Sequence, residues 1–142
     1  MDHVVYVDAK AKELDKLVEG VKKTIVRGAA GRKVPYGKVS VGDVLYFINN
    51  NAEGEIRAKG RVSNVFNSEK LTKPESVKLV QENQDKLQLT DKQFARWAGK
   101  RYIILIELDK VETVKPFKLD KKDYGNMDDW LPVGEIAKVR HG

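Results

Sequence analysis

The chain has 142 residues, a length that predicts one domain with a hydrophobic core of its own. It has no cysteine, and its two histidines, His3 and His141, lie near opposite ends. This excludes disulfide scaffolds and thiolate metal sites and argues against a histidine-based catalytic triad. The formal net charge is +6, and the whole excess lies between Gly20 and Gly42, which hold six basic residues and no acidic one. Such a segment favours anions, for example a phosphate backbone.

The first half of the chain predicts short strands separated by glycine-rich turns. β-branched and aromatic runs predict strands, apolar residues at helical spacing before Gly20 predict a helix, and glycines mark the loops. In chain order we expect a strand over 3–7, a helix over 9–19, a strand over 21–27, a basic loop over 28–42, a strand over 43–48, a turn over 49–54 and a long or bulged strand over 55–66.

The second half predicts two helices and a strongly apolar strand. Pro74 suits the first turn of a helix that extends to Leu87, and Thr90 is a typical N-cap for a shorter helix to about Ala98. The run over 101–108 predicts a buried strand, and the tail contains Trp130, which we expect to be either a pocket wall or a lid over one end of the fold. More strands than helices indicate an α+β fold with a small barrel or a strongly curved sheet.

One motif stands at the junction of the first helix and the second strand. Gly20, Lys22 and Arg27 form the pattern G-x-K-x-x-x-x-R, in which a glycine permits a close turn and two long cations follow it. Residues five apart on a regular strand face opposite sides. Lys22 and Arg27 can therefore meet on one ligand only if one of them lies outside regular pairing, and Lys22, which follows the helix cap, is the better candidate.

With the segment Val39–Phe47 that follows it, this motif resembles the ASCH family of the PUA-like superfamily. The similarity extends over residues 3–109 and includes Gln81-Glu82-Asn83 and the strand that ends at Leu108. The resemblance implies a PUA-like small curved β-barrel with helices at its ends. It also implies a single domain over residues 1–142, in which 110–142 form a C-terminal extension packed on it.

The resemblance further implies binding of RNA or of a modified nucleotide in a basic cleft formed by the motif and the loop after it. Lysine and arginine suit phosphate contacts, and aromatic rings suit base stacking. The candidate binding residues are Gly20, Lys22, Lys23, Arg27, Arg32, Lys33, Tyr36, Lys38, Trp97 and Lys100.

Two alternatives remain open at this point, and whether the protein is an enzyme is open with them. Small bacterial ASCH amidohydrolases imply hydrolysis of an acylated cytidine with Lys22, Thr24 and Glu82 as catalytic residues; a ribonuclease is a variant of this hypothesis. Ile25 occupies the position of the family's threonine, so Thr24 is one residue displaced. The second alternative is a protein-interaction domain whose basic loop meets an acidic partner.

The sequence predicts no metal and no cofactor. It contains neither GxxxxGK[ST] nor GxGxxG, the usual nucleotide-binding signatures. No apolar run approaches the length of a membrane span, and residues 1–20 carry acidic residues where a signal peptide would be apolar. We therefore expect a cytoplasmic protein that does not bind membranes.

Overall fold

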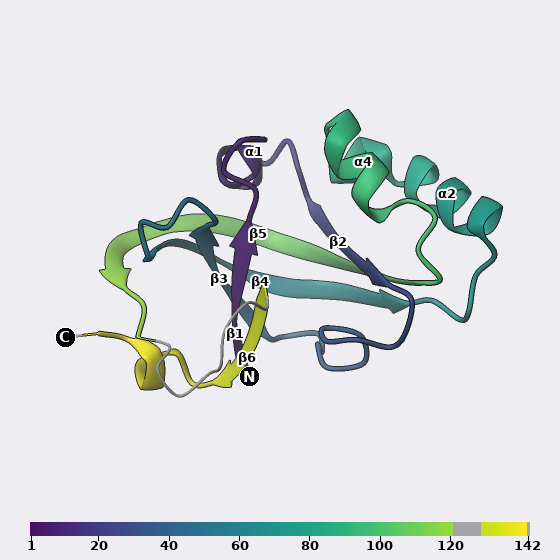
Figure 1. The fold of residues 1–142 in the computed structure, drawn as a ribbon. Helices are drawn as coiled ribbons and strands as arrows, with labels where there is room; N and C mark the ends of the chain where they lie inside the picture. The colour runs from purple at the N-terminus through teal and green to yellow at the C-terminus, as the bar shows by residue number, and fades with distance from the viewer. Residues whose placement is uncertain (121–128, 142) are drawn as a thin grey trace.

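A six-stranded sheet, curled into a half-barrel, forms the centre of the molecule (Figure 1). The structure, a computed structural model, describes residues 1–120 and 129–141. The strands are ordered β2-β5-β4-β3-β1-β6. β1 is parallel to β3, and every other neighbouring pair is antiparallel. The strands are β1 (Asp2–Val7), β2 (Thr24–Ala29), β3 (Val44–Asn49), β4 (Glu55–Asn67), β5 (Tyr102–Lys118) and β6 (Trp130–Gly134).

Four short helices and one 3₁₀ turn complete this α+β fold, as the strand and helix patterns predict. They are α1 (Glu13–Val18), α2 (Lys73–Glu82), α3 (Gln84–Leu87), α4 (Asp91–Trp97) and η1 (Ile136–Val139). The predicted helix over 9–19 is shorter than expected, and the one over 74–87 is interrupted at Asn83. Thr90 caps α4 as predicted, and Thr72 caps α2 in the same way, since each hydroxyl accepts the N–H of the residue three positions later.

The long strands β4 and β5 give the sheet its curl. The prediction of a bulged strand over 55–66 is confirmed, because the pairing of β4 with β5 shifts register at three places. The predicted end of β5 near residue 108 is wrong, since the strand continues to Lys118 (Figure 1). Most residues of its second half are exposed, and this half keeps its place by pairing with β4 rather than by a continuous apolar run.

Alternation along the strands divides the core between the two faces of the sheet. On β5, Ile104 and Ile106 point into the concave core with Phe47 of β3. Ile103 and Leu105 point outward, where α2, α3 and α4 cover them. Helices α2, α3 and α4 therefore lie beside β2 at one end of the half-barrel (Figure 1). The chain then runs from the end of α4 into β5.

Candidate functional site

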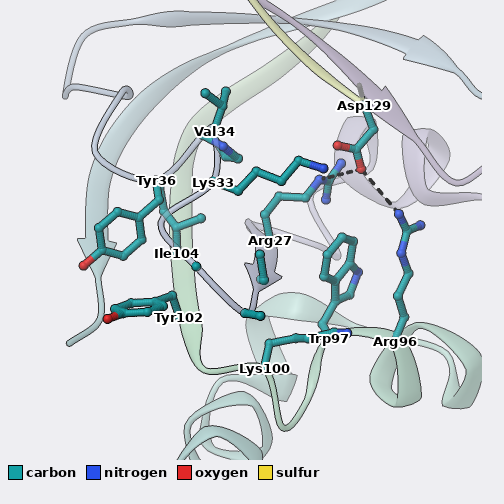
Figure 2. Close-up of a pocket in the computed structure, with 15 residues that line it drawn as sticks. Arg27, Lys33, Val34, Tyr36, Arg96, Trp97, Lys100, Tyr102, Ile104 and Asp129 are labelled. Carbon is teal, nitrogen blue, oxygen red and sulfur yellow. Dashed lines mark ion pairs between the residues drawn. The ribbon is translucent and has the colours of Figure 1, made fainter. Parts of the chain in front are cut away.

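The most prominent cavity lies where β2 ends, between the loop that follows it and the junction of α4 with β5 (Figure 2). Its volume is about 340 Å³. Among residues 1–120 and 129–141, four basic side chains and one carboxylate line it, and two tyrosines and a tryptophan add aromatic surface. We call it the Arg27 cavity and define it by Arg27, Lys33, Tyr36, Arg96, Trp97, Lys100, Tyr102 and Asp129.

Arg27 is the fixed cation of this cavity. Its side chain is buried, and its two terminal nitrogens donate to the carbonyl oxygens of Val26 and Tyr6, each at 2.8 Å. Its Nε lies 3.3 Å from Oδ2 of Asp129, and the same oxygen lies 3.7 Å from Nη2 of Arg96. A guanidinium held by two backbone carbonyls keeps one orientation, so its position does not depend on a ligand.

Trp97 lies between two arginines. The guanidinium of Arg27 is 5.4 Å from its ring centroid and that of Arg96 is 4.3 Å (Figure 2). The indole is only 8% exposed, so it forms a wall of the cavity and offers no open face for stacking. Tyr36 and Tyr102 form an edge-to-face pair with centroids 5.6 Å apart at the other side, which makes these tyrosines the accessible aromatic surface.

Trp130 lies in the core behind Arg27 and does not line the cavity. Its ring centroid is 5.7 Å from the Arg27 guanidinium, and its Nε1–H donates to Nδ1 of His3 at 3.1 Å. His3 therefore carries its own proton on Nε2, which donates to Asp43 at 2.8 Å. This buried chain of Trp130, His3 and Asp43 supports Arg27 from the rear.

The carboxylate of Asp43 ends that chain. Burial acts to raise the pKa of Asp43, but hydrogen bonds from the Ser40 amide, from His3 and from the N-terminal amine outweigh it, so the pKa lies below its ordinary value. Asp43 is thus ionised at neutral pH and accepts the hydrogen bond that orients His3.

Lys22, the other cation of the motif, lies outside the Arg27 cavity, where an ion pair and a hydrogen bond hold its ammonium group. It is 2% exposed, its Nζ is 3.3 Å from Oε2 of Glu13, and it donates to the carbonyl oxygen of Leu87. The second oxygen of Glu13 accepts the N–H of Asp8 at 2.9 Å. Burial lowers the pKa of Lys22, and the carboxylate of Glu13 opposes that shift. This pair joins α1 to the end of α3.

The three residues proposed for hydrolysis do not meet in the Arg27 cavity. Thr24 lies on the opposite face of β2, in a groove with Glu107, and its buried hydroxyl has no hydrogen-bond partner in the described part of the chain. Glu82 is exposed on α2. Ile25 is a core residue. None of Lys22, Thr24 and Glu82 lines the Arg27 cavity.

The remaining candidates are divided between the cavity and its surroundings. Five of the predicted binding residues line the cavity, namely Arg27, Lys33, Tyr36, Trp97 and Lys100. Arg32 is exposed with its guanidinium 5.6 Å from the Tyr102 ring, at the edge of the cavity. Lys23 and Lys38 are exposed outside the lining, and Gly20 makes the left-handed turn after α1 with φ of 78°.

Sequence reasoning did not single out three lining residues, Arg96, Tyr102 and Asp129. Arg96 precedes Trp97 directly, and that pairing of cation and ring was the available signal. Asp129 is brought in by the pairing of β6 with β1, because Tyr6 donates its N–H to the Asp129 carbonyl at 2.9 Å. Nothing local in the sequence marks that contact.

Two features are absent from the described residues, 1–120 and 129–141. No three His, Cys, Asp or Glu side chains gather there in a way that could hold a metal ion. No helix in that part of the chain is long and apolar enough to cross a membrane.

The fold can be compared with known proteins. No protein-family model matches the chain, and no curated protein matches it significantly in sequence. The solved structure of ASCH from Zymomonas mobilis is similar at a TM-score of 0.68 and 12% identity, covering 96% of this chain and 91% of that one. A tyrosine-to-phenylalanine mutant of the same protein has a TM-score of 0.67, also at 12% identity, over 96% of this chain and 94% of that one. The protein therefore has the α+β, PUA-like fold of an ASCH domain, as the residues Gly20, Lys22 and Arg27 indicate.

Proposed function

We propose that the Arg27 cavity binds one nucleotide of an RNA strand, or a modified nucleotide. The observation that carries this proposal is the combination, in the described part of the chain, of four basic side chains, two half-buried tyrosines and one carboxylate around a single cavity. Its volume lies at the small end of the range for ligand pockets, about 300–1,000 Å³. A chain with the fold of an ASCH domain and a local excess of positive charge is consistent with such a ligand.

The cavity offers separate places for the two parts of a nucleotide. Tyr36 and Tyr102 form an edge-to-face pair, and a base can stack on the accessible surface of these rings. Lys33 and Lys100 are exposed side chains on opposite walls, and long flexible ammonium groups can follow a phosphate. Arg27 is fixed between them and supplies a preorganised positive charge.

A titration of single-stranded RNA at two salt concentrations tests this proposal. We expect affinity to fall steeply with salt, and the double variant Lys33→Gln/Lys100→Gln to bind at least ten-fold more weakly. Each lost phosphate contact should make the slope of log K against log salt less steep by about 0.7. The matched control is Lys110→Gln/Lys115→Gln, which removes two exposed lysines from the second half of β5.

Equal losses in both double variants would mean that net charge alone attracts RNA, and would contradict a defined cavity. No binding of RNA at either salt concentration would overturn the proposal as a whole. Tight binding to an acidic protein in that case would favour the interaction-domain alternative.

A further inference from the structure

A strip of exposed basic residues continues from the rim of the Arg27 cavity. It consists of Lys70, Lys73, Lys100 and Arg101, which we call the basic strip. Two chain segments form it, one before and within the start of α2 and the other between α4 and β5. Leu71 donates its N–H to the carbonyl oxygen of Arg101 at 2.8 Å, so the two segments are hydrogen-bonded side by side.

Contacts at Gly99 place Lys73 next to the cavity rim. A Cβ atom at Gly99 would lie 3.3 Å from Cγ of Lys73, so the stem of Lys73 lies against the backbone just before Lys100. The amide of Gly99 donates to the hydroxyl of Ser76 on α2 at 3.0 Å, which ties the same segments together. Lys100 belongs to both features, since it also lines the cavity.

The charges of the basic strip are not neutralised within the protein. Across residues 1–120 and 129–141, no ion pair involves Lys70, Lys73, Lys100 or Arg101. Two acidic residues lie near them in sequence. Glu75 is held in the capping box of α2, where it accepts the N–H of Thr72 at 2.8 Å, and Glu69 is exposed. Four cations against these two acids leave the strip net positive.

We propose, resting on the proposed function, that the ligand is a single-stranded oligonucleotide whose backbone leaves the Arg27 cavity over Lys100 and runs along Arg101, Lys73 and Lys70. A cavity of about 340 Å³ holds one nucleotide, so further nucleotides must lie outside it. In the described part of the chain, the basic strip is an exposed surface next to the rim where several cations without ion-pair partners can meet consecutive phosphates. The cavity then holds one base, and the strip sets the preference for a strand over a mononucleotide.

A length series tests this proposal with the full chain. Affinities are measured for a uniform single-stranded RNA series from a nucleoside monophosphate to an octamer, at two salt concentrations. We expect the wild type to gain affinity over the first few nucleotides added and then to reach a plateau. The double variant Lys73→Gln/Arg101→Gln should bind the octamer ten-fold or more weakly and the monophosphate within two-fold of the wild type.

Salt dependence supplies a second readout. Removing two phosphate contacts should make the octamer's salt slope less steep by about 1.4, because single strands release about 0.7 counterion per contact. The matched control is again Lys110→Gln/Lys115→Gln, which should keep the wild-type slope and the wild-type gain with length.

Three outcomes separate this inference from the function it rests on. An octamer that binds no more tightly than the monophosphate overturns the basic strip and leaves the cavity intact. Equal loss of octamer affinity in the control variant also overturns it, because the effect would then be one of net charge. Octamer binding that depends on Lys73 and Arg101 while the monophosphate fails to bind would support the strip and contradict the cavity.

Discussion

Lys22 and Arg27 belong to one short motif and are both buried, yet they lie in opposite kinds of surroundings. Lys22 is enclosed, and its ammonium group contacts the carboxylate of Glu13 and donates to the carbonyl oxygen of Leu87. Arg27 is held from behind by backbone carbonyls and faces a cavity in front. The comparison shows that two cations of one motif can have different surroundings, since one joins α1 to α3 and the other faces a cavity.

The largest expected effect concerns Lys22. The substitution Lys22→Met leaves the carboxylate of Glu13 buried without its partner, so we expect the free energy of unfolding to fall by about 3–5 kcal/mol. The double variant Glu13→Gln/Lys22→Met keeps an acceptor for the Asp8 amide and removes the uncompensated charge. It should recover most of the loss in urea denaturation. A single variant within 1 kcal/mol of the wild type would contradict a structural role for this pair.

The substitution Arg27→Lys tests the other half of the comparison. It keeps the positive charge but cannot make both carbonyl hydrogen bonds in the same geometry. We expect the free energy of unfolding to fall by about 1–3 kcal/mol. RNA binding should weaken at least ten-fold when it is measured well below the melting temperature. Lys22→Met, assayed where it is folded, should bind RNA close to normally. If Lys22→Met bound RNA more weakly than Arg27→Lys, the roles assigned to the two cations would be wrong.

Acid should weaken the support behind Arg27. The pKa of Asp43 is lower in the folded protein than its ordinary value of 3.8. Its contribution to stability is therefore present above that value and is lost as the pH falls through the lower, folded pKa. We expect Asp43→Asn to be less stable than the wild type at pH 7 and to lose less stability between pH 5 and pH 2, as measured by denaturation at each pH. Parallel stability curves for the two proteins would contradict this assignment.

The smallest effect is expected at Glu82. Its side chain is exposed on α2, so Glu82→Ala should change the free energy of unfolding by no more than about 0.5 kcal/mol. RNA affinity should be unchanged as well, since Glu82 does not line the Arg27 cavity. If the wild type hydrolyses an acylated cytidine and Glu82→Ala does not, Glu82 belongs to a functional site outside the Arg27 cavity, and this prediction is wrong.

Local patterns in the sequence predicted most of the strands and the caps because those signals are local. Thr90 is an example, since its hydroxyl needs only the backbone three residues ahead. The full length of β5 was missed because residues after Leu108 are held by pairing with β4 rather than by apolar content. The sequence allowed us to predict the fold class and to identify residues of the basic loop, such as Lys33 and Tyr36, that line the cavity. The roles of Lys22 and Asp129 were not, because their partners, Glu13 and Arg27, are set by how distant elements pack.

The two hydrogen bonds of Arg27 have a consequence for solubility. β2 forms one margin of the sheet, and unpaired carbonyls on such margins are places where strands of other chains can add. Arg27 occupies the carbonyl of Val26 on β2 and that of Tyr6, at the end of β1 beyond its pairing with β6. Its guanidinium thus links β2 to β1, two strands that are not neighbours in the sheet. Loss of this arginine would remove both hydrogen bonds at this margin of the sheet, so we expect the variant to self-associate more readily than the wild type.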